Sequence, residues 1–285
     1  MHPVLFHIGS RPVYAYGLML ALSILVGWQL TVRLARKNDG LAEDAVSSAC
    51  LISAVAGVLG GRLLYVVVNP MILEESGTRW YHLTSGGSMA FGGFFGGLAA
   101  AAIYARIKGI SLAALADNAT PGLAIGTMLT RLGCYMYGCD FGTVLPEAAP
   151  GWLKSLGTFP RWSGDDGLYG SPALFHHQDR FIVEQGAATS APVHPTQLYD
   201  ALFALALFGL SLVLLKRRAF RGQIVALIGG IYAVGRYLME HLRDEPDKGE
   251  LVGFSAAQLG AILMFALCAL AYSALKNRPI DASAT

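Results

Sequence analysis

The sequence predicts an all-α integral membrane protein with about seven transmembrane helices and a small extramembrane head. Its 285 residues are 54% hydrophobic and only 14% charged, whereas soluble domains carry about 25% charged residues. The apolar residues form separate runs that are about as long as a membrane-spanning helix. One polar stretch, residues 138–195, is too long for a connector, and we expect it to form the head.

The predicted spans follow one another along the chain. The first is too long for the core of a signal peptide and lacks a basic region before it, so we expect it to be retained. The fourth is expected to begin at Asp117, with a capping side chain and Pro121 in its first turn. The spans are residues 13–32, 45–68, 88–104, 117–137, 196–215, 222–242 and 254–275. This divides the chain into spans 1–4 (1–137), the head (138–195) and spans 5–7 (196–285).

The charges predict which side of the membrane each end faces. Basic clusters follow spans 1, 3, 5 and 7, and such clusters favour the cytoplasmic side. We therefore expect an outer N-terminus, a cytoplasmic C-terminus and an outer head. The basic residues are Arg33, Arg36, Lys37, Arg106, Lys108, Lys216, Arg217, Arg218, Arg221, Lys276 and Arg278. The acidic residues expected outside are Glu74, Glu75, Asp165, Asp166, Asp179, Asp244 and Asp247.

Three arginines, Arg62, Arg131 and Arg236, lie inside apolar segments. An intramembrane guanidinium costs roughly 2.5–3.5 kcal/mol on insertion scales unless it faces a cavity or a partner. Because its planar fork matches phosphate or carboxylate, the three arginines suggest a common anionic ligand. The alternative is that each pairs with an acid, as Arg236 would with Glu240 one helical turn later.

Other polar side chains accompany these arginines. Tyr232, Arg236 and Glu240 would share one helical face, which Arg243 would extend to the interface. His194, before the predicted fifth span, is either a general base or a residue that hydrogen-bonds to a backbone carbonyl. The adjacent histidines His176 and His177 are only a weak metal signal.

Glycines in the third span and the four cysteines suggest packing roles. Gly92-Gly93 and Gly96-Gly97 would let another helix or a lipid approach closely. The cysteines show no zinc-site spacing, and Cys50 and Cys268 lie in apolar runs where they would pack as small residues. We therefore expect no metal or organic cofactor, and no basic stripe indicates nucleic acid.

Several separated motifs together resemble the bacterial prolipoprotein diacylglyceryl transferases over nearly the whole chain. They occur in the family's order and match its topology. They are Tyr14-Ala15-Tyr16-Gly17-Leu18-Met19, Gly60-Gly61-Arg62, Arg131-Leu132-Gly133 with Gly138 and Gly142, His194-Pro195-Thr196-Gln197-Leu198-Tyr199, and Tyr232 to Arg236 with Glu240, Arg243 and Pro246-Asp247.

The resemblance implies a multi-pass enzyme of the bacterial inner membrane with a periplasmic head. Such an enzyme transfers the diacylglyceryl group of phosphatidylglycerol to the lipobox cysteine of a prolipoprotein signal peptide, and we expect it to be a monomer. It implies catalytic roles for Arg131, Arg236 and Tyr232. Because this chain has Phe91 where the family usually has a histidine, we expect His194 or Asp140 to handle the proton instead. The phospholipid would contact Tyr16, Arg62, Gly92, Gly93, Gly133, Cys134, Gly138, Gly142, Glu240 and Arg243.

The sequence departs from the family pattern at four places. Phe91 precedes Gly92-Gly93 where the family usually has histidine, Cys134 replaces an asparagine, and Cys139 and Asp200 replace glutamates. Two alternative functions follow: a paralogue that uses the same lipid pocket with another acceptor, or a non-catalytic binder or transporter of anionic lipids. No internal repeat of the transporter kind is apparent.

Cys134 and Cys139 lie near the predicted outer face, which is oxidising. We consider two interpretations of the pair: a disulfide that fixes the turn between them, or two small residues packing at a helix end.

Overall fold

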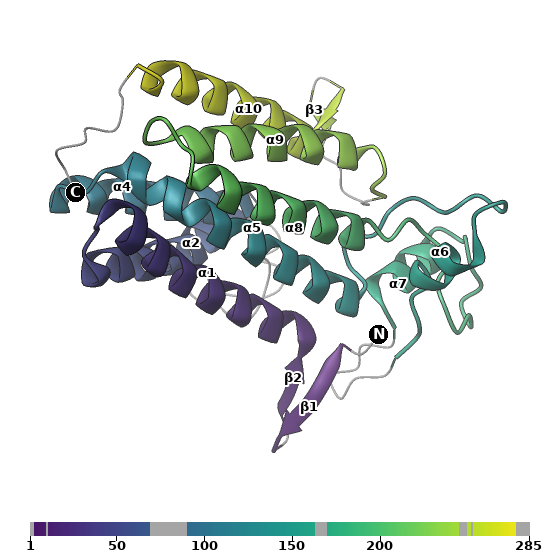
Figure 1. Cartoon of the computed structure of the whole chain (residues 1–285). Coiled ribbons are helices and arrows are strands. Elements are labelled where there is room, and N and C mark those ends of the chain that lie inside the picture. Colours follow the sequence, from purple (N-terminus) through teal and green to yellow (C-terminus); the bar gives the residue numbers. More distant parts are fainter. Residues whose placement is uncertain are drawn as a thin grey trace. The chain divides into compact units, whose positions relative to one another are not determined.

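The computed structural model describes residues 3–9, 11–68, 90–162, 170–244, 250–251 and 253–277. In this part of the chain seven long helices each overlap one of the seven predicted spans (Figure 1). Four of them, α1, α2, α8 and α10, are long and apolar enough to cross a membrane. The helices are α1 (Ala15–Asp39), α2 (Glu43–Val68), α4 (Ala90–Lys108), α5 (Leu112–Tyr137), α6 (Gly151–Leu156), α7 (Pro172–Asp179), α8 (Thr196–Leu215), α9 (Gln223–Glu240) and α10 (Ala256–Leu275).

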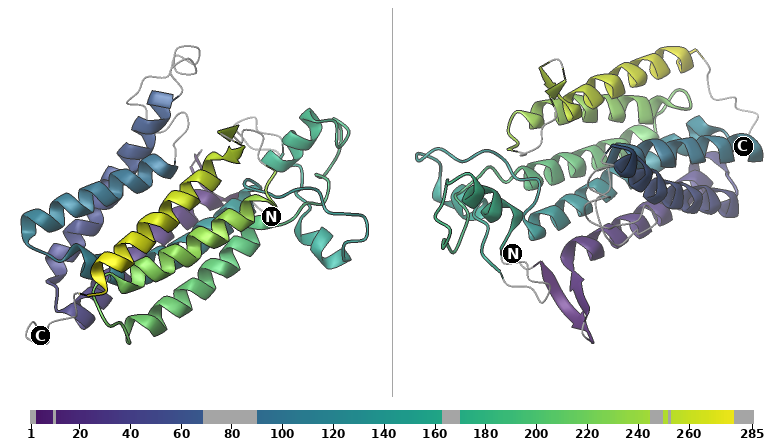
Figure 2. Two further views of the ribbon diagram at one scale, coloured as in Figure 1. Left: turned by 90° about the horizontal axis from the view of Figure 1, so that it is seen from above. Right: turned by 180° about the vertical axis from the view of Figure 1, so that it is seen from behind.

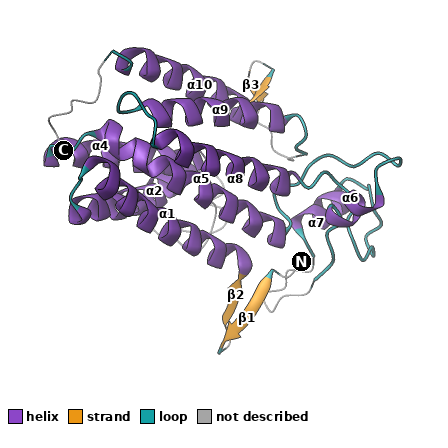
Figure 3. Ribbon diagram, in the orientation of Figure 1, coloured by secondary structure: helices purple, strands orange, loops and turns teal. Residues whose placement is uncertain are grey.

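Two short hairpins correct the all-α expectation (Figure 3). Strand β1 (Val4–Ile8) pairs antiparallel with β2 (Arg11–Tyr14), with a bulge between Val4 and Phe6. Gly9 has φ +63°, which glycine adopts without strain and which allows the chain to turn. The second hairpin pairs β3 (Glu250–Leu251) with β4 (Phe254–Ser255). The alternation of β-branched and aromatic residues near the N-terminus favours strand over helix.

Helix α5 also begins earlier than predicted. Asp117 and Asn118 lie inside it rather than at its start, and Pro121 is an interior residue. The Asn118 side chain hydrogen-bonds to the Ala114 carbonyl and to Asp39 Oδ2, so it joins two helices instead of capping one. The expected fourth-span start at Asp117 was therefore wrong, because a tertiary contact satisfies the polar side chain that resembled a cap.

The chain divides into two compact units. One is formed mainly by Trp28–Ala119, and the other by Met1–Gly27 with Thr120–Ile280. In the first unit α2 packs against α4 through glycines. A Cβ added at Gly92 would fall on the Gly60 carbonyl oxygen, and one added at Gly96 would lie 2.7 Å from the Ala56 carbonyl oxygen. The expected role of the paired glycines in close helix packing is confirmed.

In the second unit α9 packs between α8 and α10, and Figure 2 shows α9 and α10 side by side in both views. Gly235 of α9 receives the ring of Phe203 from α8. Residues of the predicted head that are described fold around a small core of Phe141, Phe159, Ala173 and Val193. This core lies directly after the end of α5, where the polar residues discussed below are found.

Some predicted features lie outside the described residues. They are the loop with Glu74, Glu75 and Arg79, the acids Asp165 and Asp166, the Pro246-Asp247 motif and the terminal Arg278.

Candidate functional site

A tight turn follows α5 and begins the site. The backbone N–H groups of Gly138 and Cys139 both donate to the Cys134 carbonyl, at 2.8 and 3.2 Å. Gly138 has φ +82° and Asp140 has φ +57°. An aspartate in this left-handed region is uncommon and costs energy that the surroundings must offset. The turn reverses the chain so that Asp140 points back toward Arg131 in the preceding helix.

The N-terminus of α8 fixes this turn. Thr196 Oγ1 donates to the Asp140 carbonyl at 2.7 Å, and Gln197 Nε2 donates to the Cys139 carbonyl at 2.6 Å. Both side chains are fully buried. This function of the His194–Tyr199 motif was not predicted from the sequence, although its adjacent Thr and Gln are residue types that can hydrogen-bond to backbone carbonyls.

Four charged side chains then form one network. Arg131 Nη1 lies 2.7 Å from Asp140 Oδ2, and Arg131 Nε lies 3.2 Å from Asp200 Oδ2. Arg243 Nη2 lies 2.7 Å from the same Asp200 oxygen, and Arg243 Nη1 lies 3.5 Å from Asp140 Oδ1. The two arginines and two aspartates have opposite formal charges, so the network is neutral as a whole. Arg131 does pair with acids, the alternative considered for it.

Asp200 was not among the predicted site residues, although it bridges both arginines. Arg243 was predicted, but on the wrong element. Helix α9 ends at Glu240, so Arg243 does not extend a helical face. Its N–H instead hydrogen-bonds to the Glu240 carbonyl at 3.3 Å, and its side chain is 2% exposed. Leaving the helix turns Arg243 inward toward Asp200 instead of outward to the interface.

A second ion pair lies on α9. Arg236 Nη1 donates to Glu240 Oε2 at 2.6 Å, which confirms the predicted pairing one turn apart. The other Glu240 oxygen accepts a 2.8 Å hydrogen bond from Ser255 Oγ, which also caps α10. Tyr232 lies one turn before Arg236 and interacts electrostatically with Arg131. Tyr232 therefore lies near both ion-pair groups.

His194 lies beside the turn. A Cβ added at Gly142 would lie 2.7 Å from His194 Cβ and 2.6 Å from the Leu242 carbonyl oxygen, so Gly142 must be small. His194 Nδ1 lies 3.4 Å from the Tyr199 hydroxyl. The His194 N–H donates to the Thr143 carbonyl. The backbone here joins three segments, because Thr143 N–H also donates to the Leu242 carbonyl.

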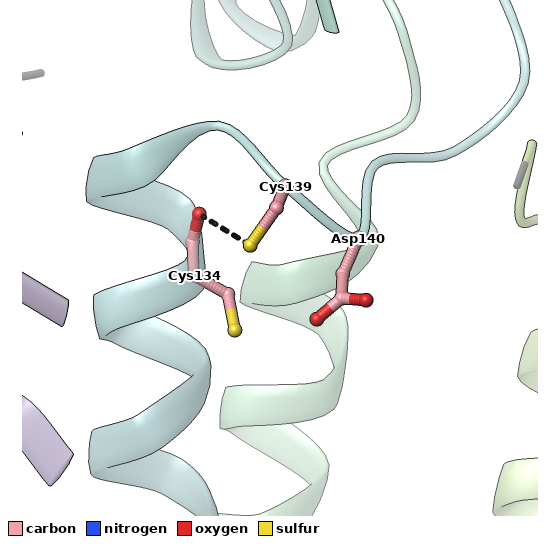
Figure 4. A group of neighbouring side chains, drawn as sticks. All are labelled: Cys134, Cys139 and Asp140. Carbon is pink, nitrogen blue, oxygen red and sulfur yellow. Dashed lines mark hydrogen bonds between the residues drawn. The ribbon is translucent and has the colours of Figure 1, made fainter. Parts of the chain in front are cut away.

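Cys134, Cys139 and Asp140 form a compact cluster (Figure 4). Both cysteines are free thiols, and Cys139 Sγ is directed at the Cys134 carbonyl oxygen, 3.8 Å away. The disulfide interpretation is therefore wrong for this structure, and the thiols pack at the helix end. The hydrogen bond with Cys134 and burial raise the pKa of the Cys139 thiol well above its ordinary value.

Tyr16 of α1 borders this cluster. Its ring lies against Gly133, where an added Cβ would be 3.2 Å from Tyr16 Cα and 3.4 Å from its Cδ2. Because Gly133 directly precedes Cys134, the Tyr16 ring lies beside the start of the cluster.

The remaining predicted site residues, Arg62, Gly92 and Gly93, belong to the other compact unit. Arg62 is 5% exposed, with its guanidinium 5.5 Å from the centre of the Tyr65 ring. Their part in the site stays a prediction.

Known proteins resemble this chain along most of its length. A family profile described as "Prolipoprotein diacylglyceryl transferase" matches residues 3–274. A phosphatidylglycerol–prolipoprotein diacylglyceryl transferase of Clostridium tetani is 27% identical over 265 residues, covering 90% of this chain and 91% of its own. A protein of that name from Dehalococcoides mccartyi is 29% identical, covering 93% and 90%. Another from Bacillus licheniformis is 28% identical, covering 98% and 95%.

Proposed function

The chain belongs to the prolipoprotein diacylglyceryl transferase family and moves the diacylglyceryl group of phosphatidylglycerol to prolipoproteins; we propose that it does so at the network of Arg131, Asp140, Asp200 and Arg243. One observation carries this assignment. Two arginines from separate segments, the partly exposed Arg131 and the buried Arg243, contact the same oxygen of Asp200. Asp140 and Asp200 both contact Arg131, so its guanidinium plane is fixed before the substrate arrives, which is what a phosphate site requires.

The reaction is an alkylation of sulfur. The thiol of the lipobox cysteine loses its proton, the sulfur forms a bond to the glyceryl carbon, and the bond from that carbon to the phosphate oxygen breaks. Glycerol phosphate leaves with the electron pair. Catalysis therefore needs cations at the leaving phosphate, an acceptor for the thiol proton, and exclusion of water.

We assign the leaving phosphate to Arg131 and Arg236. Both are arginines, which stay charged and can bind two phosphate oxygens at once. Glu240 orients Arg236 from 2.6 Å, and Asp200 orients Arg131 from 3.2 Å. Tyr232 lies near Arg131 and would donate to the same phosphate.

Two groups compete for the thiol proton. Asp140 is bound to Arg131, and its side chain is 29% exposed, so an incoming peptide can reach it. His194 has an imidazole nitrogen 3.4 Å from Tyr199 and lies against Gly142. We propose that one of them accepts the proton in place of the histidine that Phe91 replaces.

The phospholipid head group would lie along Tyr16, Gly133, Cys134, Gly138 and Gly142, which surround the turn after α5. Arg243 would hold the network together. A phospholipid-binding role for Arg62, Gly92 and Gly93 stays a prediction from the sequence. The protein would act as a monomer in the bacterial inner membrane. It would have seven spans, an outer N-terminus, a cytoplasmic C-terminus and a periplasmic head at residues 138–195.

The test uses the purified full-length protein in detergent with phosphatidylglycerol and a synthetic lipobox peptide. Mass spectrometry should find the diacylglyceryl thioether and an equal amount of glycerol phosphate. Arg131→Ala and Arg236→Ala should abolish both products. Arg131→Lys should also be strongly impaired, because lysine keeps the charge but loses the planar fork. The matched control is Arg217→Lys, which changes an exposed arginine.

The proposed site fails if Arg131→Ala retains wild-type transfer. Lipid binding without thioether would favour the alternatives, a paralogue with another acceptor or a binder of anionic lipids. Single replacements Asp140→Asn and His194→Gln decide the proton acceptor. If neither slows transfer, both assignments are wrong.

A further inference from the structure

The cluster of Cys134, Cys139 and Asp140 has the composition of a metal site. The two thiol sulfurs and a carboxylate oxygen all lie within 4.8 Å of one another. Thiolate and carboxylate together suit zinc and related thiophilic cations, which take four ligands in a tetrahedron. The sequence predicted no metal site, because the cysteine spacings match no common zinc pattern, including the five-residue step from Cys134 to Cys139. That step crosses the end of α5, where the turn folds Cys139 back toward Cys134 (Figure 4).

We propose that Cys134, Cys139 and Asp140 bind one thiophilic divalent cation of the zinc class, with a fourth position left for the acceptor thiol. The use of the fourth position by the acceptor thiol rests on the proposed transfer reaction. The binding of the cation by Cys134, Cys139 and Asp140 does not.

The backbone that carries the ligand groups is held in place before a cation binds. Cys134 lies on α5, and the backbone of the other two residues is fixed from α8. Thr196 binds the Asp140 carbonyl, and Gln197 binds the Cys139 carbonyl. These two hydrogen bonds fix the main chain from which the Cys139 and Asp140 side chains extend. The left-handed φ of Asp140, +57°, keeps its carboxylate on the same side of the turn as the sulfurs.

The neighbouring charges permit the cation. Two thiolates and Asp140 supply three negative charges, Asp200 supplies a fourth, and the cation with Arg131 and Arg243 balances them. Without the cation both thiols keep their protons and the network is also neutral. Asp200 contacts both arginines, so neither is left without a carboxylate when Asp140 turns to the cation. The Asp140 Oδ1 contact to Arg243, at 3.5 Å, is longer than the Asp140 Oδ2 contact to Arg131, at 2.7 Å.

A cation here would supply the chemistry that the transfer needs at sulfur. When a thiol coordinates such a cation, its S–H proton leaves to solvent and a sulfur–metal bond forms. Cys139 and Asp140 are only partly buried, so an acceptor peptide can approach the fourth position. The cation would then promote loss of the acceptor thiol proton, the role otherwise proposed for Asp140 or His194.

Cobalt(II) is the probe, because a thiolate bound to it gives a charge-transfer absorption that carboxylate ligands do not give. The full-length protein, kept reduced with a phosphine, is titrated in detergent. We expect one equivalent to bind with thiolate absorption and to be displaced by zinc. Cys134→Ser and Cys139→Ser should lose this absorption, and Asp140→Asn should weaken binding. The double variant Cys50→Ser/Cys268→Ser is the matched control, since its thiols lie elsewhere and it should bind like wild type.

The metal site is overturned if no thiolate absorption appears. It is also overturned if the absorption survives in Cys134→Ser and Cys139→Ser, or if it is lost in the control variant. A lipobox peptide should shift the cobalt spectrum, whereas its Cys→Ser version should not. If neither peptide shifts the spectrum, the proposal that the acceptor thiol occupies the fourth position is wrong. Metal binding without thioether formation in the mass-spectrometric assay would count against the proposed function and leave the metal site standing.

Discussion

The guanidinium of Arg243 donates a 2.7 Å hydrogen bond to Asp200, 43 residues earlier in the chain. The same carboxylate oxygen lies 3.2 Å from Arg131 Nε. One aspartate at the start of α8 therefore sets the positions of two arginines that come from different segments.

Replacing Asp200 with alanine should leave both arginines short of a carboxylate. Removing one member of a buried ion pair costs about 3–5 kcal/mol, so we expect a lower melting temperature in detergent and a loss of transfer. Asp200→Glu should keep most of the stability because the charge stays. Asp179→Ala, which removes an exposed aspartate, is the control. A wild-type melting temperature and rate for Asp200→Ala would contradict the bridging role.

Ser255 has two tasks that a pair of variants can separate. Its hydroxyl caps α10 and donates to Glu240 at 2.8 Å. Ser255→Ala should cost about 1 kcal/mol through the lost cap, whereas Ser255→Gly should cost only a few tenths. Both remove the donor to Glu240, so both should reduce transfer equally while their melting temperatures differ. Activity that instead follows stability would show that only the cap matters.

The packing of α2 against α4 should not tolerate a methyl group at Gly92. The added carbon would strike the Gly60 carbonyl oxygen, and overpacking of this kind costs about 1–3 kcal/mol. Gly209→Ala is the matched control, since nothing lies within 4 Å of its added carbon, and it should be neutral or stabilising by up to about 1 kcal/mol. Thermal unfolding in detergent compares the two. Equal melting temperatures would mean that the helices separate easily.

His177 should make the head sensitive to acid. Burial and neighbouring His176 lower its pKa, with Asp244 opposing the shift, and the Ala191 N–H donates to its Nδ1. In the unfolded chain the His177 imidazole is protonated as the pH falls below about 6.5, whereas in the folded protein it stays neutral to lower pH. Stability is therefore complete above that pH and is lost as the pH falls toward the lowered value. In His177→Gln the melting temperature should depend less on pH between these two values. In His7→Gln the pH dependence should equal that of the wild type.

Much of the fold followed from hydrophobic runs, and the predicted bounds of α8 match the structure residue for residue. The start of α5 did not follow. Asp117, Asn118 and Pro121 have the composition of a helix start, and only the contact of Asn118 with Asp39 shows why they lie inside the helix. The strands were missed because each is only a few residues long and pairs within its own hairpin.

Part of the candidate site was also predicted, again where the signal is local in the sequence. Buried charge identified Arg131 and Arg236, since the cost of a guanidinium in an apolar segment can be read from the sequence. Asp200 was missed because its neighbours in the sequence say nothing about the two arginines that it contacts across the fold. Arg243 was placed wrongly because the helical period was extended past the residue where α9 ends.

The spacing of the four network residues also gives an order to their assembly. Asp140 follows Arg131 by only nine residues, whereas Arg243 follows Asp140 by 103. Closing a short loop costs less conformational entropy than closing a long one. The Arg131–Asp140 contact is therefore the cheaper of the two to form, whereas the contacts of Asp200 and Arg243 depend on α8 and α9 being packed.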